Sequence, residues 1–254
     1  MTTLFYTKRK EEIPGISKAI YQETITRLHN EFGLSWGQTC EAAAFSMAMV
    51  IRYALGLSSA GGRSTIIASD CPSGWVALAT MRHLLNGGAL SVLFIMMKEG
   101  VPSAELSQQL YTLEKMGVTP IICDPNSVSQ DFIDVVPETH NVICGLYGSE
   151  NDYSEYVDIM NDGSIPVHAI QSPLGVDVDS GASKGNPLFA SSTLSLGLPF
   201  AGLHKGNDYV GRHYVCDISI PYALLEAQPA ISPIDSIPLI FSEQPVQQIY
   251  TESP

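Results

Sequence analysis

Basic side chains are scarce in this sequence of 254 residues, which has 13 Lys and Arg against 26 Asp and Glu and a formal net charge of −13 at pH 7. A surface with that balance repels phosphate groups, which argues against strong direct binding to nucleic acid or to an anionic membrane. Only 15% of the residues are charged and 45% are hydrophobic. The chain is therefore long and apolar enough to bury a core, and a wholly disordered protein is excluded.

Long hydrophobic runs and paired cysteines are also missing. The longest apolar stretch, Ala42–Ile51, is too short to cross a bilayer, and the charges at 8–10 argue against a secretory signal peptide. The five cysteines are an odd number with no Cys-x-x-Cys pair, which indicates reduced thiols rather than a disulfide frame or a zinc site. We therefore expect a cytoplasmic protein without a membrane interaction.

Two helices are predicted near the beginning of the chain. Ser17 is the expected N-cap of a helix that ends at Gly33. Ser35 and Gln38 form a capping-box pattern that opens a second helix, which ends near Gly56. The middle of this second helix is apolar on nearly every side, so burial within the domain is favoured over burial against another subunit.

Strands alternate with helices after residue 64. Strands are predicted at 65–68, 90–96, 118–122, 141–143, 167–170, 192–197 and 213–218. Helices are predicted between them at 74–85, 103–116, shortly after 127 and at 153–160. This order is typical of an α/β fold with a parallel sheet covered on both faces, here with a helical N-terminal extension. The Pro- and Ser-rich tail at 227–254 is expected to form irregular coil or to fray.

Three loops hold the candidate ligand-binding residues, because ligands bind where parallel strands end and helix N-termini point amide donors outward. These candidates are Ser69, Asp70, Ser73, Gly74, Cys144, Gly145, Gln171 and Gly175. The first loop, 69–75, contains neither a Gly-x-Gly-x-x-Gly fingerprint nor a Walker pattern. Trp75 puts bulk where a phosphate-binding loop needs glycine, so a turn capped by Ser73 is favoured over a phosphate site.

The second loop, 144–148, opens with Cys144. A nearby base such as His140 or His168 would make this cysteine a candidate nucleophile, but a small buried hydrophobic side chain is the favoured interpretation.

The third loop carries an acidic pattern that looks like part of a calcium loop. Asp177, Asp179 and Ser180 lack the bidentate Glu and the central Gly that such a loop needs. A turn is therefore favoured, and because the histidines also lie outside metal-ligand spacings, no metal site is predicted.

The order of several short motifs resembles the YjeF N-terminal domain family. The motifs are Ile13–Ser17, Glu41–Ala43, Ala77–Leu84, Ser172–Gly175, Thr193–Pro199 and Gly211–Pro221. The resemblance runs from about residue 13 to about residue 225 and implies one domain over 1–254, folded as a three-layer α/β/α Rossmann-like sandwich. The family includes the NAD(P)HX epimerases and the carboxyl-terminal domains of enhancer-of-mRNA-decapping scaffold proteins.

The resemblance is weakest at the enzyme motifs. The family's potassium-binding aspartate falls on Cys144, its catalytic aspartate on Gln171 and a loop serine on Leu174. A glutamine amide cannot exchange a proton near pH 7, so we expect no catalytic residue, no enzyme activity and no cofactor beyond weak binding of NAD(P) or a related nucleotide. A Gln171→Ala substitution in a surface loop is expected to leave stability nearly unchanged.

The closing sequences 196–199, 211–212 and 231–233 are similar to those of the decapping-type domains. That similarity implies a non-catalytic scaffold, a homodimer, and protein partners from the cytoplasmic mRNA-decapping machinery. Two alternatives stay open: an NAD(P)H-hydrate epimerase with an altered site, and a nucleotide-binding sensor.

Overall fold

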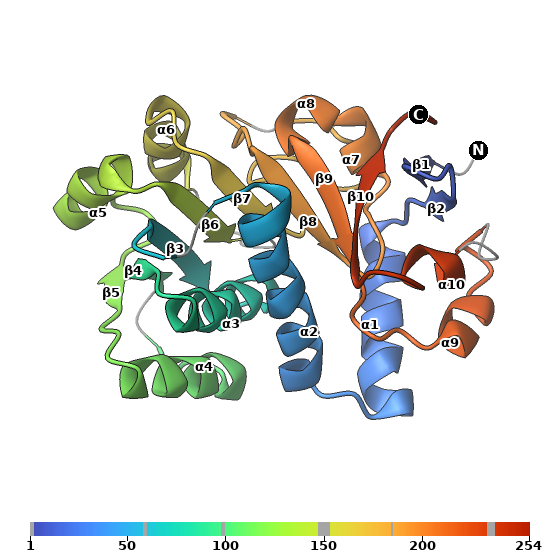
Figure 1. Ribbon diagram of the computed structural model, residues 1–254, viewed down its shortest axis with the longest axis horizontal. Coiled ribbons are helices and arrows are strands. Elements are labelled where there is room, and N and C mark those ends of the chain that lie inside the picture. Colours follow the sequence, from blue (N-terminus) through green and yellow to red (C-terminus); the bar gives the residue numbers. More distant parts are fainter. Residues whose placement is uncertain (1–2, 58–59, 98–99, 147–152, 184, 233–236) are drawn as a thin grey trace.

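One mixed sheet runs through the computed structural model, which describes residues 3–57, 60–97, 100–146, 153–183, 185–232 and 237–254. Its ten strands are ordered β2-β1-β10-β9-β8-β7-β6-β3-β4-β5 (Figure 1). In chain order they are β1 (Leu4–Thr7), β2 (Glu12–Pro14), β3 (Arg63–Ser69), β4 (Leu90–Met96), β5 (Ile121–Cys123), β6 (Asn141–Gly145), β7 (Val167–Ile170), β8 (Ser192–Leu196), β9 (Arg212–Cys216) and β10 (Val246–Tyr250).

The strands from β3 to β9 pair in parallel, as the alternation of strands and helices predicts. The chain moves outward from β3 to β4 and β5, and then returns to place β6 on the other side of β3. The order in which strands are added to the sheet therefore reverses between β3 and β6. In folds of this kind, ligands bind at the edge formed by the carboxyl ends of these strands and their neighbours.

Helices cover both faces of the sheet. They are α1 (Lys18–Phe32), α2 (Trp36–Met49), α3 (Pro72–Asn86), α4 (Ala104–Lys115), α5 (Gln130–Val135), α6 (Ser154–Asp162), α7 (Gly202–Lys205), α8 (Asn207–Val210), α9 (Tyr222–Glu226) and α10 (Ile237–Ile240), with a π-helical segment η1 (Val50–Ala54) and a 3-10 turn η2 (Val136–Glu138). Ile66 packs with α1–α4, whereas the next residue, Ile67, packs with α5 and α6. Because adjacent strand residues point to opposite faces, this contact pattern confirms the three-layer α/β/α arrangement.

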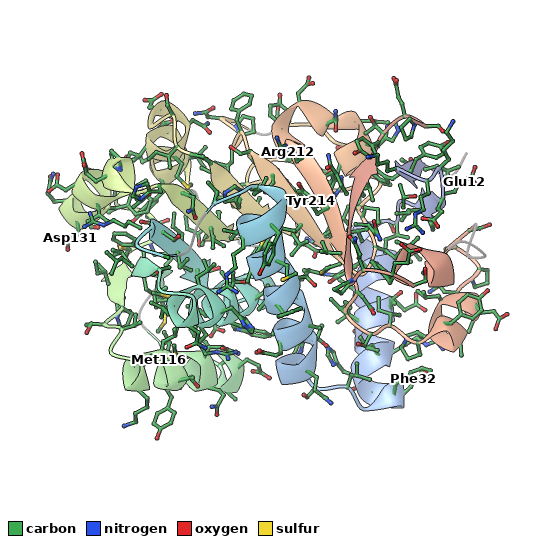
Figure 2. The ribbon with its side chains drawn as sticks, viewed as in Figure 1. Glu12, Phe32, Met116, Asp131, Arg212 and Tyr214 are labelled. Carbon is green, nitrogen blue, oxygen red and sulfur yellow. The ribbon has the colours of Figure 1, made fainter. Side chains whose placement is uncertain are left out.

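The first two helices begin where the sequence predicts. The Ser17 side chain accepts from the Ile20 backbone N–H at the start of α1, and Gly33 ends that helix in a left-handed conformation. Ser35 and Gln38 form a complete capping box at the start of α2. Phe32 and Met116, at the ends of α1 and α4, lie at the surface (Figure 2).

Burial of α2 is only partly as expected. Half of its residues are buried, but Phe45 is 47% exposed, and Tyr53 in the following π-helical segment is 74% exposed. The prediction that nearly every side of this helix is covered within the domain is therefore wrong at Phe45. In the described ranges, no helix is long and apolar enough to cross a membrane.

Both ends of the chain contribute strands that the sequence pattern does not predict. The segment before α1 forms the β1–β2 hairpin. The tail contains β10, which pairs antiparallel with both β9 and β1, so the prediction of irregular coil over the whole tail is wrong. Phe5 and Ile249 are buried on these strands, and this burial stabilises segments too short to signal a strand by themselves.

Candidate functional site

A cleft of about 540 Å³ opens between α1 and the start of α3, at the carboxyl ends of β7 and β8. Its lining consists of Lys18, Tyr21, Gln22, Ile25 and Thr26 from α1, with Trp36, Cys71, Pro72, Ser73, Gln171 and Leu196. The volume is in the range of small-molecule sites, and the lining mixes apolar surface with a few polar groups. Two of the residues expected from the sequence to bind a ligand, Ser73 and Gln171, lie in this lining.

Gln171 is held in an unusual conformation directly after β7. Its φ is 74°, and its side chain is only 1% exposed. The side-chain oxygen Oε1 accepts from the Leu196 backbone N–H at 3.2 Å, while Nε2 is buried without a partner. A left-handed non-glycine residue and an unpaired buried amide each cost about 1–3 kcal/mol. Because Oε1 is already engaged, Nε2 is a fixed donor available to an acceptor in the cleft.

The start of α3 supplies the second group of polar atoms. The Ser73 hydroxyl is buried without a partner, and it does not cap the helix, whose N-cap is Cys71. The expected capping role of Ser73 is therefore wrong. Cys71 Sγ lies 3.4 Å from Ser69 Oγ and donates to the Gly145 carbonyl at 3.6 Å. Burial raises the pKa of the Cys71 thiol, so the thiol is protonated near neutral pH.

Gly74 and Gly145 allow close packing between α3 and the ends of β3 and β6. A Cβ at Gly74 would lie 1.9 Å from the Ser69 carbonyl oxygen, and one at Gly145 would lie 2.6 Å from the Ser73 carbonyl oxygen. The first turn of α3 thus presses directly on the end of β6. Neither glycine lines the α1–α3 cleft.

The Asp70 carboxylate accepts hydrogen bonds from residues on two neighbouring segments. It accepts from Trp75 Nε1 at 2.9 Å and from the Ser103 backbone N–H at 2.7 Å, and it also accepts from the Ser103 hydroxyl. Burial acts to raise the pKa of Asp70, but the hydrogen bonds from Ser103 and Trp75 outweigh it, and the pKa lies below its ordinary value. Asp70 ties the start of α4 to α3 and lies outside the cleft lining.

Cys144 does not have the environment of a nucleophile. It is 3% exposed, and burial raises its pKa to about 12. His140 Nδ1 accepts from the Arg63 backbone N–H, and His168 Nδ1 lies 2.9 Å from Ser192 Oγ. The favoured interpretation of Cys144 as a small hydrophobic side chain agrees with this burial, and residues 147–148 of the same loop lie outside the described residues.

The potassium ion implied by the family resemblance does not fit the residues present at the end of β6. A neutral, buried thiol at Cys144 is a poor ligand for a hard monovalent cation, which prefers carboxylate, carbonyl or water oxygens. Across the described residues, no group of three His, Cys, Asp or Glu side chains is arranged to hold a metal ion.

The acidic third loop is a turn. Asp177 Oδ1 accepts from the backbone N–H groups of Asp179 and Ser180, and Asp179 Oδ1 accepts from the Lys18 backbone N–H at 2.7 Å. Gly175 has a φ of 74°, which suits glycine at a sharp turn. This loop anchors the start of α1 but contributes no residue to the cleft lining beyond Gln171.

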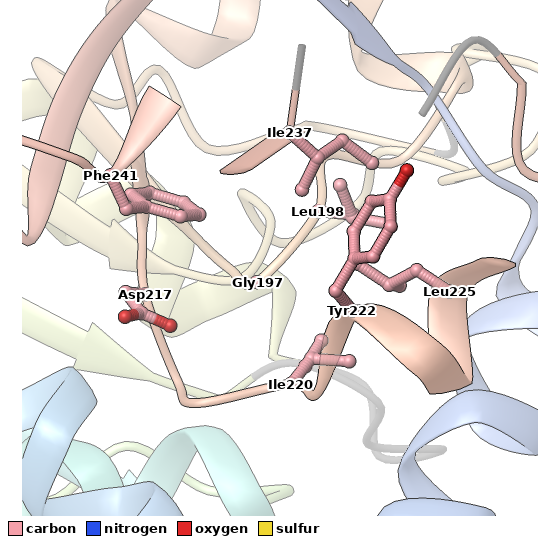
Figure 3. A pocket seen from close by; sticks show the side chains of 8 residues that line it. All are labelled: Gly197, Leu198, Asp217, Ile220, Tyr222, Leu225, Ile237 and Phe241. Atoms are coloured by element: carbon pink, nitrogen blue, oxygen red, sulfur yellow. The ribbon is translucent and has the colours of Figure 1, made fainter. Parts of the chain in front are cut away.

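A smaller cavity of about 270 Å³ lies on the other side of the β8 end (Figure 3). It is lined by Gly197, Leu198, Asp217, Ile220, Tyr222, Leu225, Ile237 and Phe241. Asp217 Oδ1 accepts from the Ser219 backbone N–H at 2.7 Å, so this carboxylate is part of a tight turn. The cavity is mostly apolar and lacks the unpartnered amide that distinguishes the larger cleft.

The sequence analysis missed one whole wall of the cleft. Lys18, Tyr21 and Gln22 come from α1, a helix that precedes the parallel strands. Their spacing is that of any amphipathic helix, so the sequence offers no signal that this face borders a ligand site rather than solvent.

The fold and the cleft together define an α/β protein with a cleft at the carboxyl edge of its sheet. The solved structure of the yeast protein YNL200c shares this fold: it matches 92% of this chain and 99% of its own, with a TM-score of 0.75 at 20% identity. A model of the family described as YjeF-related protein N-terminus matches residues 37–202. The chain belongs to this family.

Related sequences carry more specific names. An NAD(P)H-hydrate epimerase from Dehalogenimonas lykanthroporepellens is 27% identical over 88% of this chain and 89% of its own length. The bifunctional NAD(P)H-hydrate repair enzymes Nnr of Thermofilum pendens and Hyperthermus butylicus are 25% and 27% identical. The matches cover 76% and 87% of this chain but only 38% and 41% of those longer proteins.

These relatives overturn the expectation that the chain is not an enzyme. All three are named as epimerases or repair enzymes. The expectation depended on single positions, chiefly Cys144 and Gln171. The cleft, however, is also lined by Lys18, Tyr21 and Cys71, which that expectation did not take into account.

Proposed function

We propose that this chain is an isomerase that interconverts the epimers of hydrated nicotinamide nucleotides in the α1–α3 cleft. The observation that carries the proposal is the Gln171 amide, whose Nε2 is buried, unpartnered and fixed beside the cleft. An unpaired donor in a small-molecule cavity is compensated when a ligand oxygen accepts from it. The epimerase and repair-enzyme relatives indicate the class of ligand.

The reaction requires little from the protein beyond proton transfer and orientation. In a hydrated nicotinamide ring, the hydroxyl sits on a carbon bonded to the ring nitrogen. The nitrogen electron pair expels this hydroxyl as water when a proton is donated to it. Water then adds to the opposite face of the ring and returns a proton to the group that donated one, so no proton, oxidant or reductant is consumed overall.

Cys71 and Gln171 are assigned the two principal roles. Cys71 lines the cleft, and its position there is the reason for assigning it as the donor of the proton that the leaving hydroxyl requires. Burial raises the pKa of this thiol, so the thiol carries its proton near neutral pH. Gln171 Nε2 orients the ring by donating to an oxygen of the ligand, such as that of the carboxamide group. The unpartnered Ser73 hydroxyl provides a further contact on the α3 side of the cleft.

An epimerisation assay tests the proposal directly. The purified chain should interconvert the two hydrate epimers of NADH and NADPH well above a buffer blank. Cys71→Ser should lower kcat by about 100-fold or more, as expected for loss of a proton donor, and Gln171→Leu should mainly raise KM. Cys123→Ser, a change at a buried cysteine outside the cleft, should keep the activity. A purified chain that does not exceed the blank would refute this function.

We also propose, as a second candidate function that accompanies the activity, that the chain forms a homodimer which assembles with the cytoplasmic mRNA-decapping machinery. The supporting feature is the exposure of two aromatic side chains, Phe45 on α2 and Tyr53 on η1. Phe45→Asp should convert a dimer to a folded monomer, which sedimentation and circular dichroism would measure, and should reduce co-precipitation of decapping proteins. A monomeric wild-type chain would contradict the dimer.

A further inference from the structure

A second cavity borders the α1–α3 cleft and is distinct from the one in Figure 3. Its volume is about 200 Å³. It lies between the starts of α2, α3 and α4, and is lined by Trp36, Gly37, Cys40, Trp75, Ala104, Glu105, Gln108 and Gln109. Trp36 lines both spaces, so the two cavities share this indole. A ligand longer than one ring could therefore extend from the Gln171 cleft past Trp36 into the second cavity.

The shared wall of the two cavities is aromatic and rigid. The chain has only two tryptophans, and their rings lie edge to face with centroids 5.4 Å apart. Trp75 donates a hydrogen bond to Asp70, which fixes its indole. The ring of Trp36 also packs against the His29 ring, with the two ring centroids 4.3 Å apart. Trp36 is half-buried, so part of this fixed indole remains available to a planar ring. Base–aromatic stacking of this kind contributes substantially to nucleotide binding.

The polar group in the second cavity is an acceptor. The side-chain oxygen Oε1 of Gln109 is buried and has no hydrogen-bond partner. Glu105, which also lines this cavity, adds negative charge and opposes entry of a phosphate. The cavity therefore suits a neutral, planar heterocycle that carries an amino group, rather than a phosphate or a carboxylate.

We infer that this second cavity binds the adenine ring of a dinucleotide. The ring packs against Trp36, and its exocyclic amino group donates to Gln109 Oε1. This inference depends on the proposed function for the nature of the whole ligand, with the nicotinamide end at Gln171 and the adenine end at Gln109. Hypoxanthine, which presents a carbonyl oxygen in place of the amino group, would face the Gln109 oxygen with a second acceptor and is disfavoured.

Separate halves of the ligand test the adenine site. Isothermal titration of the full chain with AMP, IMP and nicotinamide mononucleotide should show AMP binding about 10-fold or more tightly than IMP. Trp36→Leu should weaken AMP binding by about 10-fold, and Trp36→Phe should retain most of the affinity. Gln109→Leu should abolish the preference for AMP over IMP. Gln130→Leu, a change at an exposed glutamine on α5 that lines neither cavity, is the control and should preserve it.

The outcomes separate this inference from the proposed function. Equal affinity for AMP and IMP in the unmodified chain, or AMP binding unaffected by Trp36→Leu, would overturn the adenine site even where epimerisation is observed. AMP binding that follows the expected pattern in a chain without epimerase activity would support the adenine site and refute the function. Nicotinamide mononucleotide should bind Gln109→Leu and the unmodified chain equally, because Gln109 lines only the second cavity and the nicotinamide ring occupies the α1–α3 cleft.

Discussion

The carboxyl edge of the sheet has a closed half and an open half. Around β3 and β6, where the strand order reverses and ligands are usually found, the first turn of α3 presses onto Gly145 and leaves no space for a side chain at Gly74. Around β7 and β8, the edge opens into the α1–α3 cleft with its unpaired Gln171 amide. The comparison shows that the fold class indicates the edge where the cleft is found, whereas local packing decides which part of that edge is accessible.

The largest expected effect comes from a substitution in the closed half. Gly74→Ala would bring a Cβ to 1.9 Å from a backbone oxygen, so α3 must shift away from the sheet. We expect the free energy of unfolding to fall by at least about 3 kcal/mol, measured by urea denaturation.

Gly37→Ala is the matched control for that substitution. Gly37 is also in the first turn of a helix, but its Cβ would find nothing closer than Ser35 Oγ at 3.7 Å. Because alanine has the higher helix propensity, this change should be neutral or stabilise the fold slightly. Similar losses at both glycines would mean that the closed half is not tightly packed.

Two buried histidines in the sheet should make the fold sensitive to acid. His168 on β7 and His213 on β9 are buried, and burial lowers their pKa values to about 4 and about 3. Both are therefore neutral in the folded state, whereas the unfolded chain takes up protons below about pH 6.5. Stability is full above that pH and is lost as the pH falls toward 4, by up to about 3 kcal/mol for each histidine.

Urea denaturation between pH 7 and pH 4 measures this loss. His213→Gln should reduce the acid sensitivity, since a glutamine cannot take up the proton. His204→Gln, at a partly exposed position on α7, should leave it unchanged. If stability stays constant over this pH range, the two histidines are not held neutral in the sheet.

The smallest of the three effects on stability is expected for Gln171, which lines the cleft and also holds the backbone of β8. Gln171→Ala should lower the free energy of unfolding by about 1–3 kcal/mol, because the Leu196 N–H loses its buried acceptor. This replaces the expectation of a neutral change, which assumed a surface loop, whereas Gln171 is 1% exposed. Thermal unfolding with and without ligand would measure it, and a fully neutral substitution would show that Oε1 contributes nothing to the fold.

Local signals in the sequence predicted the parts of the fold that depend on neighbouring residues. The caps at Ser17 and Ser35 and the strand at 90–96 are found where the sequence places them, because side chains a few residues apart determine them. β10 escaped prediction because its partners, β9 and β1, lie far away in the sequence. A strand stabilised by distant pairing need not have a strong pattern of its own.

The candidate site was predictable in its position but not in its composition. Gln171 follows a buried parallel strand, which is a sufficient reason to single it out. Gly74 and Gly145 follow the same rule, but the structure shows them accommodating a closely packed helix, a use of glycine that the sequence does not reveal. Trp36 and Lys18 became part of the cleft only through the docking of two helices against the sheet.

The placement of β10 has a consequence for the order in which the molecule can be completed. β1 pairs only with β2 and β10, so within the described sheet the hairpin at the beginning of the chain has no other strand to join. During synthesis, that hairpin must wait until residues 246–250 have emerged from the ribosome, while the parallel strands can already assemble. Interruption of translation shortly before this point would release a chain with two unsatisfied sheet edges, a form prone to aggregation.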